Sequence, residues 1–500
     1  MPTGGAWTLC REGGGQLSGR RSFWWSLLVI ASCATLLAGC GGTVVQGHAT
    51  SMMFDPDRVG GLPVTDGHSG LRPNPPEPKR TADNSDGGDI DRMVLLAIDD
   101  IEEFWSQNDS TLPKRFEPVT TLLSYDSRDP NSVDMCGSPS YKVVNASYCH
   151  GPNMDEIAWD RGVIVPVASK YFGEMALVGI LAHEYGHEIQ YKTGILTDDD
   201  PIFVAEQQAD CFAGVYLRWV AAGHSKRFEL STGDGLNHVL AGLIYIRDQL
   251  KTQRAAAARG VTNAHGSALD RVSAFQIGFA GNVDQCAAIN MDEIKKRQGD
   301  LPKFLEPDGY GDTQAVDTEI DADTLKNLMD VLGDIYSPSK PPTLSTDTKD
   351  CPDAKLSPPA SYCPANNTII VDLAGLKKLA QAKDEDNQQV LLQGDNTAIS
   401  VFTSRYALAV QHDKGLSLDT PVAAMRTGCL TGVGQAKMAE PGGKLTLSPG
   451  DADEAISGLL TNGLAASDVN GKLLPAGFTR ILAYRSGVQG TEDECYQRFP

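Results

Sequence analysis

The sequence lacks a surplus of positive charge. Its 500 residues contain 43 lysines and arginines against 64 aspartates and glutamates, which gives a formal net charge of −21. Because nucleic-acid binding requires a basic face against the phosphates, this balance argues against nucleic acid as a partner. The hydrophobic share of 41% and the charged share of 21% are ordinary for a globular protein, and the length predicts two or three domains.

Long apolar runs are also scarce, and the run near the N-terminus is too short to span a membrane comfortably. A stretch with three arginines precedes this run at residues 23–38, a pattern typical of a signal peptide. It ends in Leu37-Ala38-Gly39-Cys40, which resembles the lipobox of bacterial lipoproteins. The resemblance implies that residues 1–39 are removed and that Cys40 carries acyl chains such as palmitate, so we expect a lipid-anchored protein at the extracytoplasmic face of the cell membrane.

Cysteine pairs with Cys-x-x-Cys spacing, as in zinc ribbons, are absent. Of the 11 cysteines, two lie in the predicted signal peptide and Cys40 would take the lipid. The remaining even number indicates disulfides rather than metal ligands in an exported chain. These eight are Cys136, Cys149, Cys211, Cys286, Cys351, Cys363, Cys429 and Cys495.

The pattern of the chain predicts an α+β protein with a small sheet beside a helical body. Residues 40–88, rich in glycine, proline and polar residues, are predicted to be a flexible tether. A helix follows, and its acidic pairs Asp99-Asp100 and Glu102-Glu103 are expected on its solvated face. Strands are predicted at 119–125 and 155–160, and helices at 89–105, 165–191, 202–222, 235–254 and 267–279.

The last third of the chain repeats features of the part before it. Tyr148-Cys149 has a counterpart in Tyr362-Cys363, and Cys211-x-x-Gly-Val has one that begins at Cys429. We therefore predict a domain at residues 89–300 and a degenerate, duplicated copy at 322–500. The repeat suggests disulfide pairs, although the sequence alone leaves the connectivity open: Cys136–Cys149, Cys211–Cys286, Cys351–Cys363 and Cys429–Cys495.

Histidine is scarce, with nine in the chain, and two of them belong to the motif His183-Glu184-Tyr185-Gly186-His187. Residues four apart lie on one face of a helix, so both imidazoles can reach one metal ion. Glu184 projects about 100° around the axis from His183, where it can take a proton from a zinc-bound water. The motif predicts zinc as cofactor, with His183 and His187 as ligands and Glu184 as general base.

A catalytic zinc normally has three protein ligands, and the next predicted helix offers the third. Glu206 and Asp210 share one face of that helix, and the interval after His187 leaves room for the chain to reverse. Glu206 is predicted to bind zinc. Asp210 is predicted to accept a hydrogen bond from the far nitrogen of a ligand histidine, His183.

A peptidase also needs a donor for the developing oxyanion and a strand on which the substrate can lie. His265 is our candidate donor, with Tyr185 as a second. The alternative is that His265 has only a structural role, as a hydrogen-bonding residue at the start of the following helix, which Ser267 would cap. The strand at 155–160 is expected to pair with an extended peptide.

Three sequence blocks, HEYGHEIQ, EQQADCFAGVY and HGSALDRVSAFQIGF, resemble those of the neutral zinc metallopeptidases, a family that includes lipoprotein peptidases of actinobacteria. The resemblance covers residues 91–286 and implies a gluzincin-like fold, in which a glutamate is the third zinc ligand. One departure is Glu188, where relatives often carry another histidine. That position lies outside the expected ligand set.

These observations predict zinc-dependent hydrolysis of peptide bonds by a surface lipoprotein whose partners are a peptide or protein substrate and the membrane. Two alternatives stay open: a non-catalytic envelope-binding or scaffold lipoprotein with a structural metal, and a zinc hydrolase of cell-wall peptides. Glu184 argues against the first, because a structural zinc needs no base beside it. The sequence does not determine the oligomeric state.

Overall fold

A computed structural model of the chain divides into two units, Met1–Thr50 and Ser51–Pro500, and the description below concerns the second. The predicted signal peptide and Cys40 lie outside the described residues. Within the described part, no helix combines the length and the apolar composition needed to cross a bilayer. The structure describes residues 54–248, 265–299, 301–302, 317–347, 350–385, 389–440 and 445–500.

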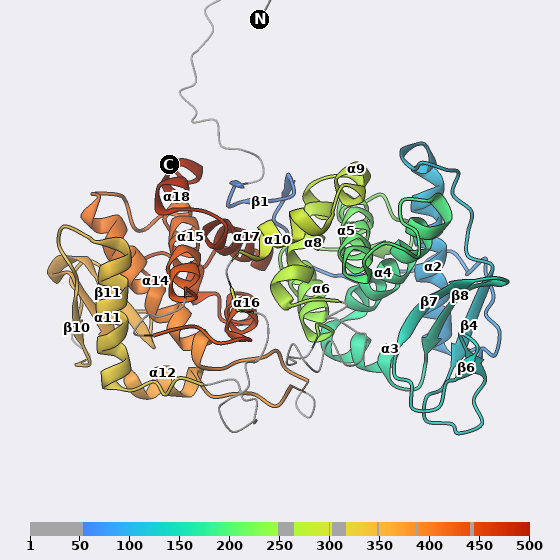
Figure 1. The fold of residues 1–500 in the computed structure, drawn as a ribbon, viewed down its shortest axis with the longest axis horizontal. Coiled ribbons are helices and arrows are strands. Elements are labelled where there is room, and N and C mark those ends of the chain that lie inside the picture. Colours follow the sequence, from blue (N-terminus) through green and yellow to red (C-terminus); the bar gives the residue numbers. More distant parts are fainter. Residues whose placement is uncertain are drawn as a thin grey trace, which may run out of the picture. The chain divides into compact units, whose positions relative to one another are not determined.

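The first half of the described chain contains a three-stranded sheet and a group of long helices (Figure 1). In the sheet, β4 (Thr121–Tyr125) is parallel to β8 (Met154–Asp160), and β7 (Ala146–Gly151) is antiparallel to β8. The order β4-β8-β7 places β8 in the middle. The helices are α2 (Asp89–Gln107), α3 (Ile164–Val167), α4 (Glu174–Thr193), α5 (Ile202–Ala221), α6 (Asp234–Tyr245), α8 (Ala268–Ala280), α9 (Val283–Ala287) and α10 (Met291–Gln298).

The single helix predicted at residues 165–191 is wrong, because the chain breaks there. α3 runs into a π-helical turn, η3 (Ala168–Phe172), and Gly173 follows with a φ of 83°. That left-handed conformation ends the first segment, since it is readily adopted only by glycine. α4 starts afresh at Glu174, and its apolar first half is buried in the core.

The second half contains a sheet of the same arrangement, in the order β10-β12-β11. β10 (Thr343–Ser345) is parallel to β12 (Thr368–Val371), and β11 (Ala360–Cys363) is antiparallel to it. Its helices are α11 (Ala322–Tyr336), α12 (Leu373–Leu379), α14 (Asp395–Asp413), α15 (Pro421–Met438), α16 (Asp451–Thr461), α17 (Gly477–Val488) and α18 (Glu492–Arg498). The short elements of the chain are β1 (Arg58–Val59), β2 (Leu62–Pro63), β3 (Gly70–Leu71), η2 (Asp109–Thr111), β5 (Asp134–Met135), β6 (Ser138–Pro139), β9 (Phe228–Glu229), η4 (Pro364–Asn366) and η5 (Leu464–Ala466).

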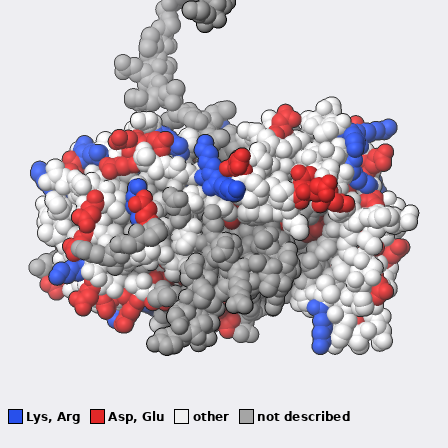
Figure 2. All heavy atoms as spheres, in the orientation of Figure 1, with Lys and Arg blue, Asp and Glu red and all other residues white. Residues whose placement is uncertain are grey.

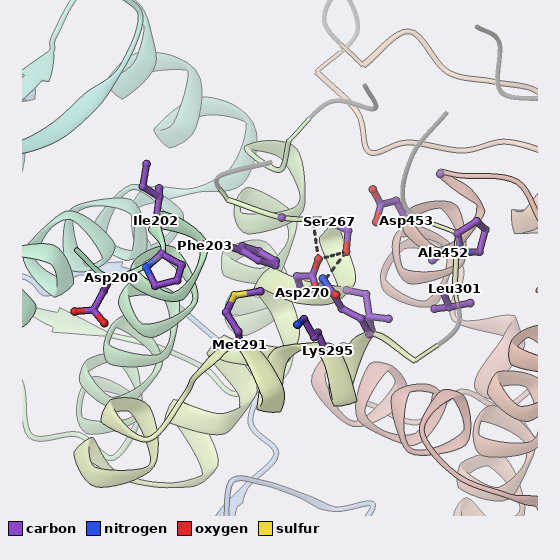
Figure 3. A pocket seen from close by; sticks show the side chains of 16 residues that line it. Asp200, Ile202, Phe203, Ser267, Asp270, Met291, Lys295, Leu301, Ala452 and Asp453 are labelled. Atoms are coloured by element: carbon purple, nitrogen blue, oxygen red, sulfur yellow. Dashed lines mark hydrogen bonds between the residues drawn. The ribbon is translucent and has the colours of Figure 1, made fainter. Parts of the chain in front are cut away.

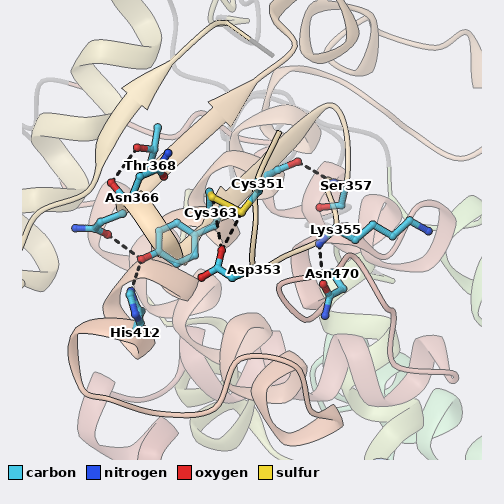
Figure 4. The surroundings of a disulfide bond; sticks show 12 residues. Cys351, Asp353, Lys355, Ser357, Cys363, Asn366, Thr368, His412 and Asn470 are labelled. Atoms are coloured by element: carbon cyan, nitrogen blue, oxygen red, sulfur yellow. Dashed lines mark hydrogen bonds between the residues drawn. A yellow bond between two sulfur atoms is a disulfide. The ribbon is translucent and has the colours of Figure 1, made fainter. Parts of the chain in front are cut away.

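Both halves also contain a close helix crossing, and in each half a disulfide links the first helix of the crossing to the short helix that follows the second. A Cβ atom on Gly214 of α5 would clash with the carbonyl oxygen of Phe275 on α8, and one on Gly432 of α15 would clash with that of Tyr484 on α17. The structure has the four disulfides that the repeat suggested: Cys136–Cys149, Cys211–Cys286, Cys351–Cys363 and Cys429–Cys495. Figure 4 shows the third, at the start of the second sheet.

The flexible tether predicted at residues 40–88 is wrong for the part that the structure describes, from Phe54 onwards. β3 pairs with β9, and Arg72 forms an ion pair of 2.8 Å with Glu229. The backbone N–H of Thr65 also donates to the Thr232 hydroxyl. A segment rich in glycine and proline can be ordered when its backbone groups find partners on a neighbouring surface.

The acidic residues of α2 do not form a solvated face, as the sequence had suggested. Asp99 and Asp100 are buried, and Asp100 accepts hydrogen bonds from the hydroxyls of Tyr216 and Ser225. The buried guanidinium of Arg227 lies 3.4 Å from Asp100. Because burial of a carboxylate is tolerated when charge and hydrogen bonds compensate it, these residues belong to the core of the first half.

Candidate metal centre

The centre is built where α4 and α5 approach each other closely. A Cβ atom on Gly186 would lie 2.8 Å from the Cα of Ala209, so only glycine allows this separation of the two helices. The approach brings His183 and His187, on α4, close to Glu206, which lies one turn before Ala209 on α5. The glycine inside the HExxH motif is therefore required by packing, while its neighbours carry the chemistry.

His183, His187 and Glu206 form one cluster, as predicted. The Oε2 atom of Glu206 lies 3.1 Å from Nε2 of His183 and 3.6 Å from Nε2 of His187. The ligand atoms of all three residues lie within 4.8 Å of one another. Oε2 is buried and makes no hydrogen bond, and two imidazoles with a carboxylate are a donor set that zinc accepts. The residues present thus fit a zinc ion.

A second layer of side chains orients the ligands. Asp210 lies 2.8 Å from Nδ1 of His183, as predicted, and it also accepts two hydrogen bonds from the buried Arg271. Gln190 lies 3.0 Å from Nδ1 of His187. With both Nδ1 atoms engaged, both Nε2 atoms are directed at the cluster.

Sequence reasoning had assigned no role in the site to Gln190 or Arg271. The spacing of Gln190, three residues after His187 on the same helix, is the signal that could have identified it.

The electrostatics of the cluster favour a positive charge at its centre. Burial lowers the pKa of His183, but the charges of Asp210 and Glu206 outweigh it and raise this pKa to about 10. Burial raises the pKa of Glu206, yet the two histidines hold it well below its usual range. A metal cation bound at this point would supply that positive charge in place of a proton on His183.

Glu184 lies beside the cluster and is held by the edge of the sheet. Its Oε2 atom accepts a hydrogen bond of 2.8 Å from the backbone N–H of Tyr148, in β7. This strand was missed in the sequence, because its residues Ala146–Gly151 do not alternate clearly between apolar and polar. The contact fixes the carboxylate on the side of the sheet edge.

The expectation that the strand at 155–160 pairs with a peptide is wrong. That strand is β8, which is hydrogen-bonded on both sides, to β4 and to β7. Strand β7 is the edge of the sheet within the described residues. The backbone N–H of Tyr148 points to Glu184 and not to β8. In an antiparallel strand pair, the backbone N–H and C=O groups of every second residue therefore point away from β8.

Tyr185, named as a second oxyanion donor, is directed away from the cluster. Its side chain is fully buried, and its hydroxyl donates to Glu102 on α2 at 2.6 Å. Its partner lies in the core, so Tyr185 ties α4 to α2. The prediction of a catalytic part for Tyr185 is wrong.

His265 lies at the centre, as expected for a residue that acts there. Its Nε2 is 3.7 Å from Oε2 of Glu206, and its Nδ1 is 3.2 Å from Asp248. The side chain is 46% exposed, so it can meet a bound molecule. Asp248, which also accepts the backbone N–H of His265, was missed because nothing in the sequence links two residues 17 positions apart.

Glu188 lies outside the cluster, in agreement with the sequence. Its carboxyl group is buried, and Lys192 lies 3.4 Å away. Burial raises its pKa to about 8, against the opposing charge of Lys192. The group is therefore mostly protonated at neutral pH.

A cavity of about 610 Å³ is lined by residues of α5, α8 and α10, among them Phe203 and Met291, and by Ser267 just before α8 (Figure 3). None of the residues of the cluster lines it. Ala452 and Asp453 of the second half complete its wall. On the face of the molecule shown in Figure 2, acidic and basic side chains of the described residues occur in separate small groups.

An HExxH helix and a buried glutamate from a second helix, beside a small sheet, define a metal centre of the metallopeptidase type. Residues 37–289, half of the chain, match the model of a family described as "putative neutral zinc metallopeptidase", and the chain belongs to this family. No curated protein and no solved structure matches the chain.

The arrangement predicts that Glu206→Gln lowers zinc affinity by about tenfold or more, because an anionic ligand becomes neutral while the side-chain volume is kept. Competition with a chromogenic zinc chelator measures the change. His224→Ala, which alters an exposed histidine outside the cluster, is the matched control and should bind zinc as the unaltered chain does. Equal affinity of the Glu206 variant and the control would remove Glu206 from the ligand set.

Proposed function

We propose that the chain hydrolyses peptide bonds at a zinc ion bound by His183, His187 and Glu206. The observation that carries the proposal is the position of Glu184, which Tyr148 holds beside the three ligands although it is not one of them. A structural site needs no such group. Zinc, when bound, lowers the pKa of water and polarises the scissile carbonyl.

The residues of the chain supply the proton transfers. Glu184 accepts a proton from the attacking water and then delivers it to the leaving amine. A carboxylate can act in this way first as a general base and then as a general acid. The N–H of Tyr148 leaves one carboxylate oxygen free for this role. His265, oriented by Asp248, donates a hydrogen bond to the negative charge that develops on the carbonyl oxygen.

The substrate would lie along the free edge of β7. An extended peptide can add to that edge as a further strand, with its own backbone groups paired to those of β7. The edge also holds Glu184, so a peptide in this position has its scissile bond near the base. This replaces the expectation for the strand at 155–160.

Hydrolysis should be lost in Glu184→Ala, by about 10³-fold or more, while one zinc per chain is retained, because the side chain transfers protons and makes no metal bond. Cleavage of casein and of muropeptides, with metal analysis of the same preparations, measures both effects. The two substrates also separate proteolysis from hydrolysis of cell-wall peptides.

Glu188→Gln is the matched control, since it changes a buried carboxyl group on the same helix that is mostly protonated at neutral pH. It should retain both zinc and activity. Activity in Glu184→Ala, or loss of its zinc, would contradict the assignment of the base.

We further propose that the chain is a lipoprotein, anchored through Cys40 to the extracytoplasmic face of the membrane. The support is the lipobox-like sequence at residues 37–40, which directly follows a basic and apolar leader. The net charge of −21 gives the protein itself no attraction to an anionic lipid surface.

Cys40→Ala should therefore release the protein from membranes, because the acyl chains would be its anchor. Fractionation of cells that express the protein, followed by detergent-free washing of the membranes, measures the partition. A Cys33→Ala variant alters a cysteine inside the leader and should stay bound. Retention of the Cys40 variant would show that the anchor lies elsewhere.

The second half is, in our proposal, a duplicated copy that lacks the zinc site. The matching sheets, the two close helix crossings and the corresponding disulfides support a duplication. The positions that correspond to His183, Glu184 and His187 carry Ser404, Arg405 and Leu408. All three are buried, and Arg405 donates to the hydroxyl of Ser467 and to the carbonyl oxygen of Leu464.

A chain with His183→Ala and His187→Ala should therefore retain no tightly bound zinc, although both halves remain. Metal analysis after dialysis measures this, and circular dichroism checks that the variant is folded. One zinc per chain in the double variant would contradict a silent second half. An experimental structure in which the two sheets and their helices do not superpose would contradict the duplication.

A further inference from the structure

A cluster of carboxylates lies in the second half, away from the peptidase residues. Asp395 is the first residue of α14, Glu454 lies in the first turn of α16, and Asp317 precedes α11. One oxygen atom of each lies within 4.8 Å of the others. Three segments that are distant in sequence thus converge on one point with negative groups only.

Two of the three residues are buried, and the Oε2 atom of Glu454 accepts a hydrogen bond of 2.8 Å from the backbone N–H of Asn396. Asp395 is 2% exposed and Glu454 is 8% exposed. The Oδ1 atom of Asp395 is buried without a hydrogen-bond partner, while its Oδ2 accepts the backbone N–H of Thr318. Within the described residues, no lysine or arginine forms an ion pair with these acids, in contrast to the buried carboxylates beside Arg227 and Arg271.

Mutual repulsion acts against the ionised state of the cluster. Burial, together with the charges of Asp395 and Asp451, raises the pKa of Glu454 to about 9. Burial and the charge of Asp395 raise the pKa of Asp451 to about 7. A buried group of carboxylates with so little compensation either holds protons or binds a cation.

We propose that Asp317, Asp395 and Glu454 bind a calcium ion. The donors are oxygen atoms alone, which favours a hard cation over zinc. Calcium takes carboxylates in irregular geometry and from separate segments, whereas magnesium demands a small octahedron. The unpartnered Oδ1 of Asp395 supplies a free ligand atom at the buried end of the site.

The site lies on a helix that also supports the peptidase half. Next to Glu454 on α16, the buried Asp453 accepts the backbone N–H of Ala268 at 2.9 Å and forms an ion pair of 3.1 Å with Arg247. Ala268 is the first residue of α8, three positions after His265, and Arg247 precedes Asp248. Calcium at the cluster would therefore fix the end of α16 whose Asp453 contacts Ala268 and Arg247. These two residues lie near His265 and Asp248, respectively, along the chain.

Isothermal titration calorimetry of the full-length, zinc-loaded protein with calcium chloride tests the site. We expect one calcium ion per chain and a rise in Tm with calcium. Glu454→Gln and Asp395→Asn keep the hydrogen-bond acceptors but remove one charge each, so they should weaken binding by about tenfold or more. Asp334→Asn, an exposed acid of α11 outside the cluster, is the matched control and should bind as the unaltered chain does.

The Tm of the calcium-free protein gives a second test, in which the Glu454 variant is expected to be more stable than the unaltered chain. Glu454→Gln should raise the Tm of the calcium-free protein, because it replaces a carboxyl group whose ionised form is disfavoured by burial and by the neighbouring acids. The variant should also lose the further rise that calcium causes. Absence of calcium binding to the unaltered chain would overturn the proposal. Binding that is equally strong in the Glu454 and Asp334 variants would overturn it as well.

Discussion

The contact between α4 and α5 at Gly186 and Ala209 determines where the proposed metal ligands, His183, His187 and Glu206, meet. At this point the two backbones are so close that even a methyl group would have to displace the neighbouring helix. The geometry brings a carboxylate from α5 within 3.1 Å of an imidazole on α4. Because the ligands come from rigid helices, their separation is fixed before any metal binds, and little reorganisation is needed on binding.

The buried carboxylates of this protein include two different kinds, which differ in the partners of their oxygen atoms. Asp100 and Asp210 are buried against a buried guanidinium, that of Arg227 and that of Arg271, respectively. The metal ligand Glu206 and the cluster around Asp395 instead leave a buried oxygen without a hydrogen bond. The first arrangement stabilises a packed core, and the second leaves room for a cation.

The second half contacts the peptidase half through the same helices that surround the centre. Arg485 of α17 donates to the carbonyl oxygen of Ser273, and Gln276 donates to that of Phe478. Asp453 binds the start of α8. α8 follows closely after His265 in the chain and also packs against the second half.

The sequence by itself determined the parts of this protein that rest on local periodicity and spacing. The HExxH motif and the face shared by Glu206 and Asp210 could be read there, because residues three or four apart on a helix share a face. The cysteine pairs were suggested by the repeat and not by helical spacing. The parts that depend on distant neighbours were decided by the tertiary structure. The burial of Asp99 and Asp100, the central position of β8 and the contact of Asp248 with His265 each require a partner far along the chain. No local pattern encodes such a partner, since the free energy of a buried charge or a strand edge is set by what the fold places against it.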